Sequence, residues 1–220
     1  MTQPIPPAAV IFDCDGVIVD SEAMTFDLLV EDFARHGLQL SHDQIAQDYL
    51  GGTMADVARR ARAAGASLPP DWVETFYQRL YTHLATGTPL VPEVLTVLDA
   101  LDAAGIPYAI GSNGSDQKMQ ITLGQHPGLI ARFRGHLYSG QTLVAPKPAP
   151  DLYLHAARQL GTRPDTTIVI EDSPTGARAA HAAGMRCFGY AAQTPAPRLT
   201  QEGAIPFTRM GDLPRLLGLG

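Results

Sequence analysis

The chain has 220 residues and a formal net charge of −6, and its Lys and Arg residues together number only 16. This charge argues against a nucleic-acid-binding protein, and no apolar stretch is long enough to span a membrane. The length allows one medium-sized domain, or a larger domain that carries an inserted smaller one. Two cysteines are too few for a disulfide framework. We see no signal-peptide pattern and therefore expect a cytoplasmic protein with no membrane or nucleic-acid partner.

A buried strand that ends in two acids comes first in the chain. The run Ala8–Phe12 has the length and residue types of a strand that is buried in a parallel sheet. It leads directly into Asp13, Cys14, Asp15 and Gly16. Two carboxylates at the end of a buried strand are costly unless a cation or hydrogen-bond donors compensate them. The carboxyl end of this strand is therefore our first candidate for a functional site.

Residues 22–86 have a different character. Apolar residues recur there at helical spacing, and glycines and a Pro-Pro pair separate the groups. Ser41, followed three residues later by Gln44, matches a capping box at the start of a helix. We expect four helices and no strand in this segment, which is inserted between the first strand and the rest of the chain.

From residue 89 onward, strand and helix patterns alternate. Strands are predicted at 107–110, 137–139, 167–170, 185–190 and 205–207, and helices at 92–104, 118–123, 149–160, 173–183 and 213–217. Such alternation predicts a parallel sheet with right-handed crossovers. The expected fold class is therefore α/β: a Rossmann-like, three-layer α/β/α core with a mainly parallel sheet, plus an inserted all-helical domain.

Polar residues that look out of place in this pattern share one position in the expected sheet. They follow the carboxyl ends of three strands or open a helix loop: Asp13, Asp15, Ser112, Asn113, Lys147, Glu171 and Asp172. Each has a plainer explanation on its own: Ser112 as a turn residue, Lys147 as a surface lysine, and the acid pair as electrostatic capping of a helix. Ligands of open parallel sheets bind at the carboxyl ends of the strands. The shared position therefore outweighs the separate explanations.

Carboxylates, a hydroxyl and a lysine at one sheet edge suit a divalent cation beside a phosphate. Mg²⁺ prefers a few carboxylates together with water and substrate oxygens. An aspartate beside such a metal stays ionised and can act as a nucleophile. Ser112, the Asn113 amide and Lys147 can hold the phosphoryl oxygens. We therefore expect Mg²⁺ as the cofactor and a phosphorylated substrate, while the residues alone leave open which aspartate attacks.

The motif set resembles a known family. Asp13-x-Asp15-Gly16, Ser112, Lys147-Pro148 and Glu171-Asp172 resemble the four motifs of the haloacid dehalogenase-like hydrolase superfamily. Residues 20–22 and 147–151 resemble its beta-phosphoglucomutase-like phosphatase branch, and the runs 112–114, 118–120 and 138–140 resemble members of the 6-phosphogluconate phosphatase type. The resemblance implies an α/β catalytic core of residues 1–16 and 89–220 with a helical cap of residues 17–88. The motifs are specific to the superfamily and not to one substrate.

The resemblance also implies a role for each motif residue. Asp13 is the implied nucleophile, which forms an aspartyl-phosphate, and Asp15 is the implied general acid and base, with its backbone carbonyl on Mg²⁺. The implied metal ligands are Asp13, Asp15, Asp172 and Glu171, the last either as a ligand or as a partner of the ligands. Phosphate binding falls to Ser112, Asn113 and Lys147. The cap candidates for substrate specificity are Glu22, Gly51, Gly52, Thr53 and Met54.

Other cap and motif residues have competing interpretations. Arg59, Arg60 and Arg79 are further cap candidates for binding the leaving group, although each is also explained as an ordinary residue on a helix. Cys14 lies beside Asp13, but the acids around it disfavour a thiolate. No arginine follows shortly after it, as a cysteine phosphatase would need. We therefore interpret Cys14 as a small core residue.

Departures from the mutases of the branch favour hydrolysis. Where those enzymes carry a histidine, an arginine and a lysine, this chain has Thr25, Met54 and Ser115. A mutase must hold a second phosphate while its intermediate turns over, and the missing cations weaken that hold. We expect a monomeric, Mg²⁺-dependent phosphatase that acts on a small phosphorylated metabolite, either a sugar phosphate or a phospho-acid. A sugar-phosphate mutase and, more remotely, a non-catalytic metabolite-binding protein are the alternatives.

Overall fold

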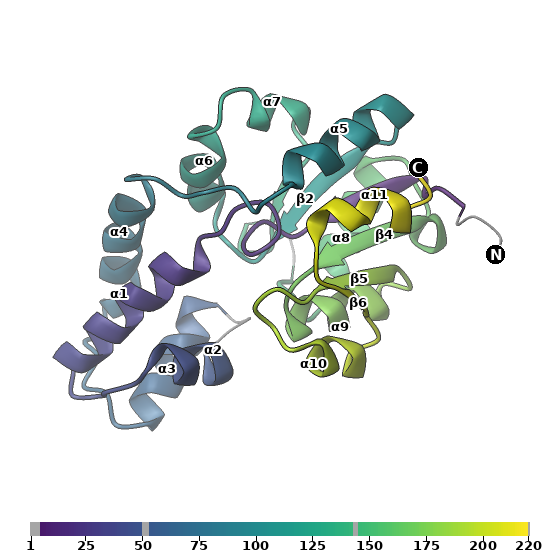
Figure 1. Ribbon diagram of the computed structural model, residues 1–220. Coiled ribbons are helices and arrows are strands. Elements are labelled where there is room, and N and C mark those ends of the chain that lie inside the picture. Colours follow the sequence, from purple (N-terminus) through teal and green to yellow (C-terminus); the bar gives the residue numbers. More distant parts are fainter. Residues whose placement is uncertain (1–4, 50–52, 143–144, 220) are drawn as a thin grey trace.

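The computed structural model describes residues 5–49, 53–142 and 145–219. Within these residues, six strands form one sheet of order β3-β2-β1-β4-β5-β6, and every neighbouring pair is parallel. The strands are β1 Ala9–Phe12, β2 Tyr108–Ser112, β3 Leu137–Ser139, β4 Thr167–Glu171, β5 Arg186–Tyr190 and β6 Ile205–Phe207. The first strand thus lies in the middle of the sheet, between β2 and β4, where both of its edges are paired (Figure 1).

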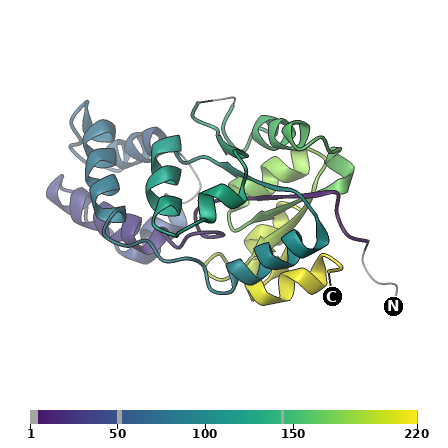
Figure 2. The same ribbon diagram turned by 90° about the horizontal axis from the view of Figure 1, so that it is seen from above.

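Helices cover both faces of the sheet. One face packs against α5 Val94–Ala104, α6 Asp116–Gly124, α7 Leu129–Arg132 and α11 Leu213–Leu216, and the other against α8 Asp151–Gln159, α9 Pro174–Ala182 and α10 Ala196–Gln201. Val10 and Phe12 belong to the first core and Ile11 to the second, as the two-residue period of a strand requires. Figure 2 shows the two layers of helices with the sheet between them. The predicted three-layer α/β core is therefore confirmed.

The inserted segment contains the four expected helices and has a hydrophobic core of its own. They are α1 Glu22–Arg35, α2 His42–Asp48, α3 Met54–Ala63 and α4 Trp72–Leu84. Trp72 lies at the centre of their core, with its ring 5.7 Å from that of Phe33 and 4.9 Å from that of Phe76. Its indole N–H donates to the buried carboxylate of Asp32 at 2.5 Å. Figure 1 shows this helical group beside the carboxyl ends of the strands, so that it can cover them.

The remaining predicted elements differ from the structure in only a few places. The capping box at Ser41 is present. Helix α6 begins at Asp116, two residues before the predicted start, because the Ser115 hydroxyl accepts a hydrogen bond from the Lys118 amide and caps the helix. The short helices α7 and α10 were not predicted, since four and six residues are too few to establish a helical period.

No helix in the parts of the chain described above is both long enough and apolar enough to cross a membrane.

Candidate active site

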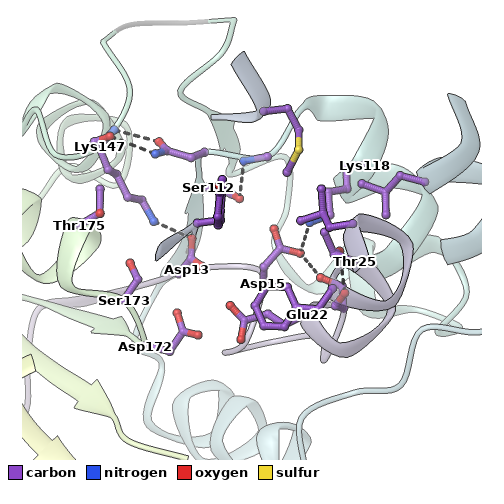
Figure 3. Close-up of a pocket in the computed structure, with 18 of the residues that line it drawn as sticks. Asp13, Asp15, Glu22, Thr25, Ser112, Lys118, Lys147, Asp172, Ser173 and Thr175 are labelled. Carbon is purple, nitrogen blue, oxygen red and sulfur yellow. Dashed lines mark hydrogen bonds and ion pairs between the residues drawn. The ribbon is translucent and has the colours of Figure 1, made fainter. Parts of the chain in front are cut away.

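A cavity of about 140 Å³ lies where the strand ends meet the inserted helices. The register pairs Phe12 with Ile110 of β2 and with Ile170 of β4, so the polar residues that follow these strands begin at one edge of the sheet (Figure 3). All of the motif residues predicted for the core line the cavity: Asp13, Asp15, Ser112, Asn113, Lys147, Glu171 and Asp172. The structure thus brings together residues that are up to 159 positions apart, since Asp13 and Asp172 line the same cavity.

Lys147 joins the ends of β1 and β4. Its Nζ lies 2.6 Å from Asp13 Oδ1 and 2.7 Å from Glu171 Oε1, and all three side chains are buried. Burial raises the pKa of Asp13 to about 7, although the Lys147 ammonium opposes that rise. Burial also acts to lower the pKa of Lys147, but Asp13 and Glu171 outweigh it and the pKa is raised. Lys147 therefore remains charged, while Asp13 lacks full compensation for its negative charge.

Asn113, predicted to bind phosphate, also has a structural role, which is to hold the backbone of Lys147. Its side-chain Oδ1 accepts from the Lys147 amide at 2.8 Å, and its Nδ2 donates to the Lys147 carbonyl at 3.1 Å. These two bonds fix the backbone from which Lys147 reaches Asp13. The Ser112 hydroxyl lines the cavity and accepts from the Gly114 amide at 2.9 Å. Ser112 and Asn113, two of the three predicted phosphate-binding residues, thus line the same cavity as Asp13.

Glu171 is surrounded by hydrogen-bond donors. Oε1 accepts from Lys147 and from the Tyr153 hydroxyl, and Oε2 accepts from the amides of Asp172 and Ser173 and from the Ser173 hydroxyl. Burial acts to raise the pKa of Glu171, but Lys147 and the other donors outweigh it, and the pKa lies below its ordinary value. Because both oxygens of this carboxylate already accept hydrogen bonds from several donors, Glu171 is suited to orient Lys147 and Asp172. Of the two alternatives for Glu171, the partner of the ligands fits this geometry better.

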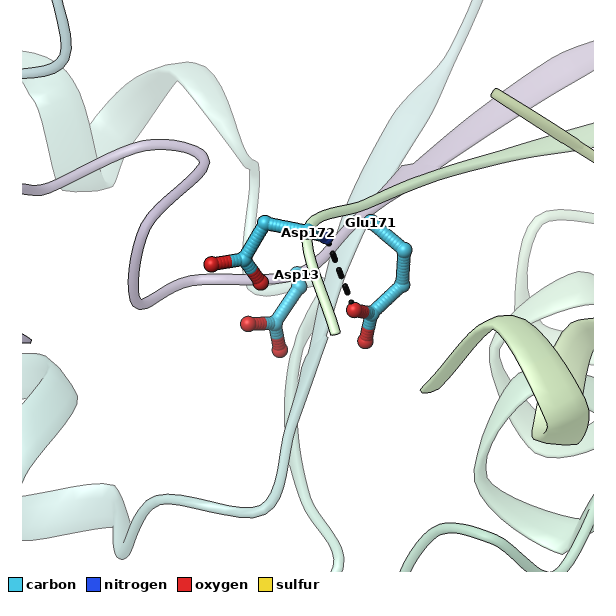
Figure 4. Close-up of side chains that lie close together, drawn as sticks. All are labelled: Asp13, Glu171 and Asp172. Carbon is cyan, nitrogen blue, oxygen red and sulfur yellow. Dashed lines mark hydrogen bonds between the residues drawn. The ribbon is translucent and has the colours of Figure 1, made fainter. Parts of the chain in front are cut away.

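Asp172 is the least compensated acid in the cavity. Asp13, Glu171 and Asp172 each offer a carboxylate oxygen within 4.8 Å of the others (Figure 4). Among the described residues, no hydrogen bond or ion pair reaches the Asp172 side chain. Burial raises its pKa well above the ordinary value, and Glu22 and Glu171 add to that rise. Gly16, with φ of 76°, makes room for it, since a Cβ there would lie 2.0 Å from Asp172 Oδ2.

The donor set of the cavity fits Mg²⁺. Five carboxylates line the cavity against two lysines, and their oxygens are the hard ligands that Mg²⁺ prefers. Asp13 and Asp172 have carboxylate oxygens that a cation would stabilise in the ionised form. The excess of negative charge and the uncompensated Asp172 therefore favour a bound divalent cation at this edge of the sheet.

Asp15 has a partner that the sequence analysis missed. Asp15 Oδ1 accepts from Lys118 Nζ at 2.8 Å and also from the Ser21 hydroxyl. Burial acts to raise the pKa of Asp15, but Lys118 and Ser21 outweigh it, and the pKa lies below its ordinary value. Lys118 lies in the first turn of α6, where the helix dipole disfavours a cation. That unfavourable position was the available signal for a functional lysine.

The inserted helices contribute part of the predicted specificity set. Glu22, Thr25 and Met54 line the cavity, and so do the unpredicted Tyr77 and Leu80 of α4. Phe26 and Leu29 of α1 and Tyr49, the residue that ends α2, complete this side of the lining. Burial raises the pKa of Glu22 to about 7, and the neighbouring Asp15 adds to that rise.

Thr53 and the cap arginines are not among the residues that line the cavity. The Thr53 hydroxyl instead caps α3 by accepting from the Asp56 amide at 3.2 Å. Arg59 pairs with Asp56, Arg60 donates to the backbone carbonyls that end α2, and Arg79 pairs with the buried Asp32. The structure thus gives Thr53 a role as a helix cap, and its role as a specificity residue stays a prediction. Gly51 and Gly52 lie outside the described residues.

Two further residues near the motifs have structural roles. Ser115, which stands where mutases carry a lysine, caps α6 and makes a hydrogen bond with the Tyr81 hydroxyl of α4 at 2.5 Å. Gln141 Nε2 donates to the Tyr77 hydroxyl at 3.1 Å and to the Asn113 carbonyl at 2.8 Å. These bonds connect α4 to the loops that carry the phosphate-binding candidates.

Cys14 is buried, and burial raises its pKa, which agrees with its interpretation as a core residue.

The fold and the motif geometry agree with the comparison to known families. A family model described as haloacid dehalogenase-like hydrolase matches residues 7–184. The chain belongs to the haloacid dehalogenase-like hydrolase family. This membership confirms the resemblance noted in the sequence. The chain is therefore a hydrolase of phosphoric monoesters, that is, a phosphatase.

Named relatives of this haloacid dehalogenase-like hydrolase cover nearly the whole chain. The 6-phosphogluconate phosphatase of Escherichia coli (strain K12) is 27% identical over 94% of this chain and 93% of its own length. A haloacid dehalogenase-like protein from Agrobacterium tumefaciens is 32% identical with a TM-score of 0.84, and covers 96% of this chain and 97% of its own. A hydrolase of the family from Deinococcus radiodurans, with bound phosphate and sodium, is 34% identical with a TM-score of 0.79, and covers 97% of both chains.

Proposed function

We propose that this chain is a Mg²⁺-dependent phosphatase that hydrolyses a small phosphorylated metabolite, a sugar phosphate or a phospho-acid, through an aspartyl-phosphate on Asp13. The observation that carries the proposal is the Asp13 carboxylate itself, which lies at the end of β1, 2.6 Å from the Lys147 ammonium and within a cluster of acids. Relatives named as a 6-phosphogluconate phosphatase and a hexitol phosphatase support the substrate range.

The chemistry assigned to the two aspartates is a double displacement. A carboxylate oxygen of Asp13 attacks phosphorus, the bond to the leaving-group oxygen breaks, and that oxygen takes a proton from Asp15. Asp15 then accepts a proton from a water molecule as the water attacks the aspartyl-phosphate, which releases inorganic phosphate and restores Asp13. Lys118 and Ser21 hold Asp15 in the ionised form that suits the second step. The negative charge of a bound phosphate favours its protonation for the first step.

The remaining motif residues hold the reacting groups. Ser112, the Asn113 amide and Lys147 bind phosphoryl oxygens, and positioning of this kind supplies most of the catalysis in phosphoryl transfer. Asp13, Asp172 and the Asp15 carbonyl would hold Mg²⁺, and Glu171 would orient them. When bound, the ion supplies compensation for the negative charge of the acids and the phosphoryl group. The uncompensated Asp172 supports this ligand set.

The inserted helices act as a cap in this proposal. Residues 17–88 form the cap, and residues 1–16 and 89–220 form the catalytic core. The separate hydrophobic core of α1–α4 and the bonds from α4 to the loops after β2 and β3 support a unit that closes over the site. Closure would exclude bulk water and select the leaving group. Glu22, Thr25, Met54 and Tyr77 provide the selecting surface.

A sugar-phosphate mutase is not favoured. Thr25 and Met54 line the cavity where the mutases carry cations, and Ser115 makes a hydrogen bond with Tyr81 and offers no charge. Lys118 supplies one cation, but the carboxylate of Asp15 already balances its charge, although hydrogen-bond donors of its ammonium group remain. A second phosphate would therefore meet few unengaged positive charges. The non-catalytic alternative lacks support, because the family is one of hydrolases.

Phosphate release tests the proposal. The wild-type protein with Mg²⁺ should hydrolyse p-nitrophenyl phosphate, and both EDTA and the substitution Asp13→Asn should abolish the reaction. Asp165→Asn, at an exposed site on the 3-10 turn Pro164–Thr166, is the matched control and should retain the wild-type rate. Unchanged turnover in Asp13→Asn would overturn the mechanism.

A further inference from the structure

Lys118 has more hydrogen-bond donors than partners. An ammonium group has three donors, and among the described residues the Lys118 Nζ contacts a single acceptor, Asp15 Oδ1, at 2.8 Å. The Lys147 ammonium, by contrast, meets both Asp13 and Glu171. Only 13% of the Lys118 side chain is exposed, and it lines the catalytic cavity. Removing donors from water without a new acceptor is unfavourable, so the remaining Lys118 donors are suited to a bound ligand.

Glu22, on the same side of the cavity, has the opposite property: its carboxylate has acceptor oxygens without donors. It is the first residue of α1 and lines the cavity, and within the described parts of the chain no donor reaches its carboxylate. In the view of Figure 3, Lys118 and Glu22 flank the Asp15 carboxylate, while Lys147 lies on the far side of Asp13. The wall next to Asp15 therefore offers both unused donors and unused acceptors.

The position of this wall assigns it to the leaving group. Lys147 and Ser112 serve the phosphoryl group beside Asp13, whereas Asp15 gives its proton to the oxygen that leaves. Groups that flank Asp15 therefore contact the atoms attached to that oxygen. Met54 and Tyr77 also line this cavity and provide apolar surface for the rest of the leaving group.

A hydroxyl group matches this wall better than the other substituents of small phosphate esters. Its oxygen accepts from Lys118 while its proton is donated to Glu22, since a hydroxyl is both a donor and an acceptor. A carboxylate would satisfy Lys118 but would repel Glu22, and a methylene group would satisfy neither. We propose that Lys118, together with Glu22, is a specificity-determining residue that binds a hydroxyl group of the leaving group close to the scissile oxygen. The inference rests on the phosphatase activity proposed above.

The test compares two esters that differ only in their hydroxyl groups, glycerol 3-phosphate and n-propyl phosphate. The wild-type kcat/KM should favour glycerol 3-phosphate by about 10- to 100-fold, the factor expected for a hydrogen bond to a charged group. Lys118→Met should reduce this preference to nearly one, and Lys118→Arg should retain most of it. Both Lys118 variants will also alter Asp15, but that change affects the two esters alike and leaves their ratio unaffected. Gln117→Met, an exposed neighbour on α6, is the control and should keep the wild-type ratio.

Four results would overturn the inference. A wild-type ratio near one, or a wild-type ratio that persists in Lys118→Met, would restrict Lys118 to holding Asp15. Hydrolysis of p-nitrophenyl phosphate but of neither ester would refute hydroxyl binding and leave the phosphatase proposal standing. If none of the three compounds releases phosphate, both proposals fail. Should Lys118→Met not fold, as judged by circular dichroism, Lys118→Gln replaces it and is subject to the same criteria.

Discussion

The buried carboxylate of Asp13 should make the metal-free protein less stable as the pH rises. Only 8% of the residue is exposed, and the pKa of its carboxyl group rises from an ordinary 3.8 to about 7, chiefly because of burial. A carboxyl group with a raised pKa binds its proton more tightly in the folded protein than in the unfolded chain. Between about pH 4 and pH 7 the folded state therefore binds more protons, and the free energy of unfolding falls as the pH rises.

The size of this effect follows from the shift. Each pH unit between the unfolded and folded pKa costs about 1.4 kcal/mol, so the Asp13 contribution falls by about 2 kcal/mol from pH 5 to pH 7. The substitution Asp13→Asn removes this titration. In EDTA, the free energy of unfolding of Asp13→Asn minus that of the wild type should therefore be about 2 kcal/mol larger at pH 7 than at pH 5.

Urea denaturation of both proteins at the two pH values, in EDTA and in Mg²⁺, measures this difference. Saturating Mg²⁺ should stabilise the wild type more than Asp13→Asn and so reduce the difference at pH 7, because a cation that binds only the folded state stabilises it. The difference between the two proteins measures the titration of Asp13 together with its effect on Glu22 and Asp172, because Asp13 helps to raise the pKa of both. A difference that is independent of pH in EDTA, or that decreases from pH 5 to pH 7, would refute the reasoning.

Two further substitutions test the metal site and the cap contact. Gly16→Ala would place a Cβ 2.0 Å from Asp172 Oδ2 and should weaken Mg²⁺ binding by about 10- to 100-fold in a calorimetric titration. Gly37→Ala is the control, because Gly37 has a similar positive φ but no atom lies within 4 Å of the position that its Cβ would take. This variant should leave Mg²⁺ binding unchanged. Equal Mg²⁺ affinities of these two variants would contradict the role assigned to Asp172. Tyr81→Phe removes the hydroxyl that contacts Ser115 and should raise the KM by about fivefold, the equivalent of about 1 kcal/mol. An unchanged KM would show that this bond does not favour the closed cap.

The catalytic edge could be predicted because its residues violate the local pattern. Asp13 and Asp172 follow strands that are buried throughout, and acids are expensive in such positions unless they have a function. Parallel pairing then requires that these strand ends lie together. The sequence rules therefore located the sheet edge where these residues meet, and the family resemblance supplied the proposed roles of Asp13 and Asp15.

The cap side of the cavity could not be predicted in the same way. Tyr77 and Leu80 lie on one face of α4, and which face meets the core depends on how the inserted helices are placed, which no local pattern encodes. Thr53 illustrates a signal that was overlooked, because Thr53 and Asp56 have the spacing of a capping box. Lys118 was missed since its significance comes from contact with Asp15, which is more than 100 positions away in the chain.

Trapping the covalent intermediate tests the central claim most directly. A rapid acid quench of the wild type during turnover with excess substrate and Mg²⁺, followed by peptide mass spectrometry, should find one phosphoryl group on Asp13. Asp15→Asn should retain the label for longer, because the proposed mechanism assigns to Asp15 the role of base in hydrolysis of the intermediate. A phosphoryl group on any other residue, or rapid turnover with no labelled peptide in either protein, would contradict the account.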